Sequence, residues 1–401
     1  MSRTLQQHFL ALEEVLLSLQ PLWQAQPFKQ SRPLWCETNP QLTEALLQLA
    51  DAELASLRED DLRLHQWLSA YLPQFAQLPE LLRLPVQQTE VRSAPSHLDW
   101  AIPGRKWQQI LRFAESVEST ARPLLEWCGG KGHLGRLLAS RWQQPVTTLE
   151  RDTGLCAAGS DLAQRARVQQ SFQPIDVFSP LSPDLHPYHT VALHACGELH
   201  RTLVRKAVAE QAPALDIAPC CYHLYGEECY QAFTATARLQ LSRDDLRLAV
   251  TETVTSKPRE VARRDREMAW KLGFLQLYAD LSGDRDYRAL APIDKQWLND
   301  GFESFCQRMA LREGIQVLSS TSLDFDAYEQ HGWRRQAEVM RLSLMRHALR
   351  RVLELWLVLD MAIYLQQQGY QVRLSTFCET VLTPRNILLS ARREDYSAVE
   401  H

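Results

Sequence analysis

The sequence predicts an α/β fold in which helices flank a mostly parallel β-sheet. Three observations lead to this class. Residues 124–138, LLEWCGGKGHLGRLL, have the pattern of a strand, a glycine-rich loop and a helix. Strand-like and helix-like stretches then alternate as far as residue 230. Two more strand-like stretches follow a long helical region near the C-terminus, and we expect them to join the same sheet.

Length and composition are typical of a soluble protein with two or three domains. The chain has 401 residues, of which 45% are hydrophobic and 23% are charged. Its net charge of −4 lacks the excess of basic charge that is typical of nucleic-acid-binding proteins. The nine cysteines lack paired spacings and the N-terminus lacks the apolar core of a signal peptide, so we expect a reducing cytoplasm. The apolar run at 353–365 is shorter than the roughly 20 residues that span a bilayer, and it predicts a buried helix instead of a membrane contact.

Residues 1–95 are expected to form an N-terminal helical domain. Leu5, Phe9 and Leu12 begin an apolar face with helical spacing, and Asn39 followed by Pro40 is typical of a helix start. Acidic residues outnumber basic ones in this region, so it is a poor candidate for binding phosphates by itself. Residues 85–95 have the composition of a linker.

Residues 96–230 are expected to form the core of the sheet. Helices are predicted at 107–117, at 155–167 and up to about residue 210. In a parallel sheet, ligands bind beyond the carboxyl ends of the strands. Five candidate residues fall at those ends: Gly130, Glu150, Asp176, Cys196 and Cys220. The predicted strands begin at Leu124 and cover 146–149, 168–171, 190–195 and 214–218.

Residues 231–366 are expected to form a helical insertion, and residues 367–401 a hairpin that completes the sheet. Ser242 has the position of a helix cap. Further helices are predicted at 259–277, 302–312 and 334–365, and the two strands of the hairpin at 371–377 and 386–390.

The glycine-rich loop matches two classes of cofactor site. Residues 130–135 fit the G-x-G-x-x-G pattern of a dinucleotide site. The other pattern, acidic-x-G-x-G-x-G, belongs to S-adenosylmethionine sites, with Glu126 as the acid and Cys128 at the first glycine position. A carboxylate inside the turn favours the ammonium group of S-adenosylmethionine and would repel a pyrophosphate. Glu150 suits a ribose hydroxyl in both classes and does not discriminate between them.

Four motifs together are more specific than the loop alone. EWCGGKGHL, LHACGEL, APCCYH and a C-terminal LTPRN resemble the methyltransferase-like family that is related to the tRNA 2′-O-methyltransferases acting near the acceptor stem. The resemblance covers roughly residues 100–230 well and 330–392 more loosely. It implies a class I S-adenosylmethionine-dependent methyltransferase with a Rossmann-like, seven-stranded sheet. Cys128 departs from the pattern, because its side chain would crowd the turn. The predicted cofactor-binding residues are Glu126, Cys128, Gly130, Gly132, His133, Leu134, Glu150, Asp176 (at the adenine) and His194.

A group of histidines and cysteines lies at the ends of the fourth and fifth strands: His194, Cys196, Cys220, Cys221 and His223. They could line the pocket where the methyl group is transferred, bind a metal, or pack in the core. H-x-C and CC-x-H are not standard zinc spacings, so we favour the pocket and predict no metal. His223 is the predicted general base, with Cys196 and Cys220 as further catalytic candidates. Cys220 also follows a proline, as does the nucleophile of cytosine C5-methyltransferases, which is a rival interpretation.

Two basic stretches bear on the acceptor. Residues 259–271 mix arginines with acids, which is typical of a solvated face. Residues 334–351 carry six arginines against one acid, Glu338, and could contact phosphates. Together with the resemblance, this predicts an RNA acceptor. Lys131 and His133 are expected to face solvent at the start of their helix and to contact the cofactor mainly through their backbone. The alternatives are a protein or small-molecule acceptor, or a non-catalytic cofactor-binding module; no obligate protein partner is evident.

Overall fold

The chain forms two compact units in the computed structural model, which describes residues 3–30, 32–87, 98–100, 102–251, 258–314 and 323–393. The first, here called the sheet unit, comprises residues 1–18, 77–252 and 350–401. The second, the helical unit, comprises residues 19–76 and 253–349. This division differs from the four consecutive segments expected from the sequence, because each unit takes helices from both the N-terminal and the C-terminal part of the chain.

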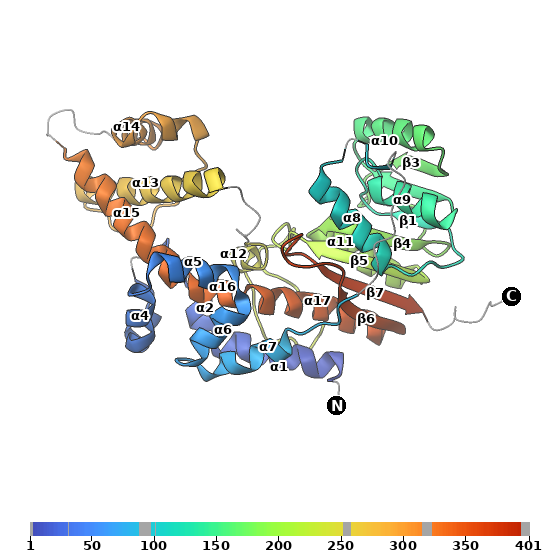
Figure 1. Ribbon diagram of the computed structural model, residues 1–401, viewed down its shortest axis with the longest axis horizontal. Helices are drawn as coiled ribbons and strands as arrows, with labels where there is room; N and C mark the ends of the chain where they lie inside the picture. Colours follow the sequence, from blue (N-terminus) through green and yellow to red (C-terminus); the bar gives the residue numbers. More distant parts are fainter. Residues whose placement is uncertain are drawn as a thin grey trace. The chain divides into compact units, whose positions relative to one another are not determined.

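The sheet unit contains one seven-stranded sheet with the order β3-β2-β1-β4-β5-β7-β6 (Figure 1). The first five strands in the sequence pair in parallel, and β7 is antiparallel to both β5 and β6. This confirms the Rossmann-like α/β sheet and the hairpin that completes it. The strands are β1 (Leu124–Glu126), β2 (Val146–Glu150), β3 (Gln170–Pro174), β4 (His189–Cys196), β5 (Ala214–Cys220), β6 (Tyr370–Thr376) and β7 (Ile387–Arg393).

The third strand begins two residues later than predicted and extends to Pro174. Its position follows from its pairing with β2, in which Val146 lies opposite Gln170 and Glu150 opposite Pro174. The apolar run at residue 168 suggested an earlier start, but Val168 packs against the core from the end of the preceding turn. Edge strands with polar sequences such as QSFQP give a weak strand signal.

A buried polar network joins β4, β5 and β7. Asp216 of β5 is fully buried, and its carboxylate contacts His189 Nε2 at 2.6 Å, Arg392 Nη2 at 2.7 Å and Ser390 Oγ at 2.5 Å. The guanidinium of Arg392 and the hydrogen bonds outweigh the effect of burial, so the pKa of Asp216 is lowered. The C-terminal strand therefore supplies two of the partners of a charge in the middle of the sheet.

Helices pack on the sheet from segments far apart in the sequence. α9 packs on β1, β2 and β3, α11 on β4 and β5, and α17 on β6 and β7. α1 lies against α17, where the rings of Phe9 and Trp356 stack with their centroids 5.0 Å apart. These helices are α1 (Leu5–Ser18), α7 (Leu78–Leu81), α8 (Gly104–Ser116), α9 (His133–Trp142), α10 (Thr153–Ala166), α11 (Glu198–Ala209), α12 (Arg243–Leu248) and α17 (Arg350–Gln367).

The helical unit is built around the long helix α13, which packs along α15. Trp270, Phe302 and Phe305 form an aromatic cluster in its core. The described helices of this unit are α2 (Gln20–Gln24), α3 (Trp35–Thr38), α4 (Pro40–Leu47), α5 (Asp51–Glu59), α6 (Asp61–Ser69), η1 (Pro73–Gln77), α13 (Pro258–Ser282), η3 (Lys295–Asn299), α14 (Phe302–Arg312), α15 (Phe325–Leu342) and α16 (Leu344–Ala348).

The single helix predicted at 334–365 is wrong, because the chain forms α15, α16 and α17 there. The interruptions are short: Ser343 separates the first two helices, and Leu349, with φ −104° and ψ 3°, separates the last two. Apolar periodicity continues across such one-residue breaks, so it cannot reveal them. The break at Leu349 is where the chain passes from the helical unit to the sheet unit.

Part of the predicted linker is strand-like. Thr376 of β6 accepts a hydrogen bond from Gln87 N at 3.1 Å and donates one to Pro85 O at 2.9 Å. The remainder of that linker, and the domain boundary placed at residues 95 and 96, lie outside the described residues. Among the described helices, none is long and apolar enough to cross a membrane.

Candidate functional site

A cavity of about 260 Å³ lies at the carboxyl ends of β1, β2 and β4. It contains seven of the nine residues predicted to bind the cofactor: Glu126, Cys128, Gly130, His133, Leu134, Glu150 and His194. Gly132 and Asp176 are not among the lining residues. The other lining residues are Lys106, Gln109, Ile110, Trp127, Gly129 and Leu193.

The glycine-rich loop leaves open space on the cavity side. Gly130 has φ 60°, and a Cβ added there would meet no atom within 4 Å. Gly132 has φ 62°, but a Cβ there would lie 2.3 Å from Gln170 Nε2, so this glycine allows packing against β3. Cys128 also has a left-handed backbone, with φ 53°, at the position where the sequence pattern expects glycine. The loop therefore keeps its turn despite the cysteine.

Glu126 is the last residue of β1, and its side chain packs against the glycine-rich loop. Its side chain is buried, and its Oε2 accepts a hydrogen bond from Thr148 Oγ1 at 2.8 Å. A Cβ on Gly129 or Gly135 would approach its carboxyl group to 2.5 Å, so the carboxyl lies directly against the loop and the start of α9. Desolvation raises the pKa of Glu126 to about 7, against the opposing effect of the Thr148 hydrogen bond.

Glu150 is the last residue of β2, and its carboxylate accepts hydrogen bonds from the loops that follow β1 and β2. Its Oε2 accepts a hydrogen bond from Gly130 N at 3.1 Å, and its Oε1 accepts one from Asp152 N at 3.0 Å. Asp176 lies in the loop after β3, where its exposed carboxylate accepts a hydrogen bond from Phe178 N at 3.0 Å. Glu150 thus lines the cavity, and both Glu150 and Asp176 act electrostatically on Cys128, which also lines it.

Two uncharged imidazoles complete the wall. Burial lowers the pKa of His133 to about 3, and its Nδ1 lies 2.7 Å from Arg136 Nη2, which can only donate. The expected solvent-facing position of His133 is therefore wrong, because α9 turns this side chain inward. Burial lowers the pKa of His194 to about 4. His194 has φ 62° at a bulge in β4 that shifts the register with β5.

Lys106 and Gln109 of α8 were not identified from the sequence. Lys106 acts electrostatically on Glu126, His133 and His194, which places a cation at the cavity. Gln109 Oε1 lies 3.3 Å from His194 Nε2, and its Nε2 donates to Leu382 O at 2.9 Å. Together with Ile110, these residues have the i, i+3, i+4 spacing of one helix face. That spacing was visible in the sequence, but which element the face meets was not.

Residues 105–228 match the family Methyltransf_32, described as a methyltransferase domain. No curated protein matches the chain.

Solved structures with similarity to the chain include several enzymes at low identity. The cyclase SpnF shows 17% identity and a TM-score of 0.25, over 37% of this chain and 59% of its own length. The 23S rRNA methyltransferase ErmE shows 16% identity and a TM-score of 0.25, over 49% of this chain and 96% of its own. Coclaurine N-methyltransferase, solved with N-methylheliamine and SAH, shows 10% identity and a TM-score of 0.27, over 78% and 92%.

The predicted catalytic residues Cys196, Cys220 and His223 are not among the residues that line the cavity. Cys196 and Cys220 are paired residues on neighbouring strands, with their sulfur atoms 3.4 Å apart. Cys221 lies next to both. His223 is half-buried, and its Nδ1 is buried without a hydrogen-bond partner. Of the five histidines and cysteines predicted at the ends of the fourth and fifth strands, only His194 is among the residues that line the cavity.

The arginines that suggested phosphate contact are largely used inside the protein. Arg346 donates to the carbonyl oxygens of residues 23, 24 and 25, and Arg341 to Leu49 O and Asp51. Arg335 bonds with Glu338 and with the carbonyls of Pro27 and Gln30. These side chains hold the N-terminal helices of the helical unit against α15 and α16.

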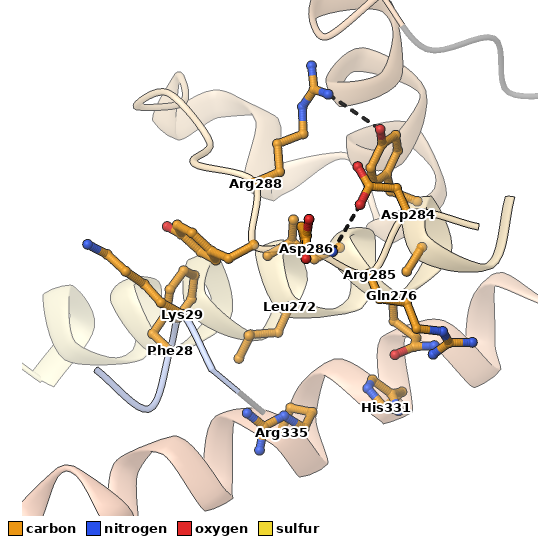
Figure 2. A pocket seen from close by; sticks show the side chains of 14 residues that line it. Phe28, Lys29, Leu272, Gln276, Asp284, Arg285, Asp286, Arg288, His331 and Arg335 are labelled. Atoms are coloured by element: carbon orange, nitrogen blue, oxygen red, sulfur yellow. Dashed lines mark hydrogen bonds between the residues drawn. The ribbon is translucent and has the colours of Figure 1, made fainter. Parts of the chain in front are cut away.

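A second cavity, of about 220 Å³, lies in the helical unit. Figure 2 shows Phe28 and Lys29 on one side of it, with His331 and Arg335 projecting from α15 on another. Arg288 donates to Tyr278 Oη at 3.5 Å across its upper rim. Asp284 and Asp286 offset the cations, so the lining has no single sign of charge.

Proposed function

We propose that the protein is an S-adenosylmethionine-dependent methyltransferase whose cofactor binds in the cavity at the glycine-rich loop. The observation that carries this proposal is the open space at Gly130 between charges of both signs. A methionine end needs a cation for its carboxylate and an anion for its ammonium group. Lys106 and Glu126 are the candidates for these roles, and Glu150 is the candidate for the ribose hydroxyls. Asp176, in the loop after β3, is the candidate for the adenine.

The same charges disfavour a dinucleotide. A pyrophosphate on the loop would lie beside Glu126, whose carboxyl group packs directly against the loop. The bound S-adenosylmethionine would supply an electrophilic methyl group, and the protein would align the acceptor with it.

Isothermal calorimetry with S-adenosylmethionine and with NAD tests the proposal. Gly130→Val should abolish binding of S-adenosylmethionine, because its side chain would occupy the open space of the cavity. Gly369→Val is the matched control, since Gly369 also has a positive φ and open space around it but lies between α17 and β6. Binding of NAD without S-adenosylmethionine would overturn the assignment, as would equal loss of binding in both variants.

We further propose RNA as the acceptor, on the resemblance of the four motifs. The arginine-rich stretch at 334–351 no longer supports this step, because most of its guanidinium groups bond within the protein. The decisive experiment incubates the protein with tritiated cofactor and extract from a strain that lacks it. Label in RNA supports the proposal. Label in protein or small molecules refutes it, and tight cofactor binding without any transfer would indicate a non-catalytic binding module.

His223 is proposed as the general base for a hydroxyl or protonated nitrogen acceptor. Its Nδ1 has no hydrogen-bond partner among the described residues. His223→Ala should leave cofactor affinity nearly unchanged and lower turnover of the labelled acceptor by about a hundredfold. Cys220→Ser distinguishes the thiolate mechanism, in which covalent addition needs sulfur and all activity would be lost. Retention of full turnover in His223→Ala would remove this residue from the mechanism, with the exposed His186→Ala as a control.

A further inference from the structure

Three thiol groups converge where β4 and β5 end. Cys196 is the last residue of β4, Cys220 the last of β5, and Cys221 the next in the chain. The strand pairing places Cys196 opposite Cys220, with their sulfur atoms 3.4 Å apart. All three sulfur atoms lie within 4.8 Å of one another. Cys220 is buried and the other two are half-buried.

The backbone adopts a costly conformation at this point. Successive residues of a strand direct their side chains to opposite faces, so Cys220 and Cys221 would normally diverge. Cys221 instead has φ 48°, in the left-handed region that non-glycine residues rarely adopt. This turn accompanies the convergence of the two sulfur atoms. Strain of this kind is concentrated at functional sites.

The sulfur positions suit one class of ligand. Zinc–thiolate bonds are about 2.3 Å long, which places the sulfur atoms of a tetrahedral site about 3.8 Å apart. The sulfur atoms of Cys196 and Cys220 lie 3.4 Å apart, and all three sulfur atoms lie within 4.8 Å of one another, so one ion could contact all three. We propose that Cys196, Cys220 and Cys221 bind a thiophilic divalent cation of the zinc class through three thiolates. The motif spacing did not predict such a site, because one of its three ligands comes from a different strand.

The surroundings suit the charge of such a complex. Three thiolates and a divalent cation carry one net negative charge, and the guanidinium of Arg385 acts electrostatically on Cys221. Arg385 is itself held by a hydrogen bond from its Nη2 to Val250 O at 2.7 Å. Within the described residues, no fourth cysteine, histidine or carboxylate shares the 4.8 Å group. The fourth coordination position is thus open to water or to another molecule, as in catalytic zinc sites.

The experiment uses the full-length protein, reduced and stripped of metal under anaerobic conditions. It is then equilibrated with Zn²⁺ alone or Co²⁺ alone, and the stoichiometry is measured by native mass spectrometry. We expect one ion per chain, and with Co²⁺ a thiolate-to-cobalt charge-transfer band. No methyl donor or acceptor is present, so failure of this proposal and failure of the proposed function are separate results.

Variants then locate the ion. Cys221→Ser should weaken zinc binding about a hundredfold or more and diminish the cobalt band, whereas Cys229→Ser, an exposed cysteine of the same unit, should change neither. Circular dichroism melting verifies that each variant folds, and if Cys221→Ser does not fold, the cobalt spectrum of the wild type decides. The proposal is overturned if the reduced wild type shows no charge-transfer band or if Cys221→Ser retains zinc as well as the wild type.

Discussion

At the residue scale, the environment of Glu126 links proton binding to ligand binding. Its carboxyl group is buried against the loop, and desolvation raises its pKa from 4.5 to about 7. An ammonium group placed beside it would favour the ionised form. Below the raised pKa the ligand must displace a proton, whereas above it the carboxylate is already present. Affinity for S-adenosylmethionine should therefore rise with pH up to about 7 and then level off.

Glu126→Gln should remove this dependence. We expect the wild type to gain up to about tenfold in affinity for each pH unit below 7, since one pH unit corresponds to about 1.4 kcal/mol. The variant should bind more weakly at pH 8 and show little change between pH 5.5 and 8. Calorimetry across this range measures both, with Glu80→Gln, an exposed acid of α7, as the control. A wild-type affinity that falls as pH rises toward 7 would contradict the assignment of Glu126 to the ammonium group.

At the element scale, the C-terminal hairpin of β6 and β7 is an integral part of the sheet and not a separate tail. β7 pairs with β5 and supplies Ser390 and Arg392 to the buried carboxylate of Asp216. Without these partners, Asp216 would stay buried but would lose its hydrogen bond from Ser390 and its ion pair with Arg392. Breaking a buried charge network by removing one partner costs about 3–5 kcal/mol, a large part of the stability of a typical domain.

Truncation after Gly369 should therefore give protein that is insoluble or lacks a cooperative unfolding transition. A chain that ends after Arg393 keeps both strands and is the matched control. Differential scanning calorimetry and cofactor titration compare the two. If the shorter chain melts cooperatively and still binds the cofactor, the hairpin is not part of the folding unit.

At the scale of the whole molecule, each compact unit is assembled from distant segments. α1, at the start of the chain, belongs to the sheet unit and packs on α17 through Phe9 and Trp356. Phe9 is fully buried, whereas the next residue, Leu10, is 40% exposed. The N-terminal helix is thus a structural part of the sheet unit, although more than 100 residues separate it from β1.

Phe9→Ala should lower the free energy of unfolding of the sheet unit by about 3–5 kcal/mol, because it leaves a cavity beneath Trp356. Leu10→Ala, one position along the same helix, should cost much less. Chemical denaturation followed by the fluorescence of the tryptophans measures both changes. Equal and small effects of the two substitutions would show that α1 is not part of the folded unit.

Local signals in the sequence determined most of the sheet and the glycine-rich loop. The strands other than β3, the helix from 302 to 312 and the hairpin follow from periodicity. The loop follows from its glycines, because glycine adopts a positive φ without strain. Seven predicted cofactor residues share one cavity because the ends of parallel strands meet at one edge of a sheet. These features depend on neighbours in the chain or on a general rule of topology.

The tertiary structure alone decided the remaining features. Lys106 and Gln109 face the loop, the arginines of α15 and α16 bond to backbone carbonyls, and Cys196 meets Cys220 and Cys221. Each depends on contacts between residues tens to hundreds of positions apart. A pattern of residue types specifies which side of a helix or strand is polar. The element that this side contacts is set by how the whole chain packs. For this reason the chemistry of the site was only partly visible in the sequence.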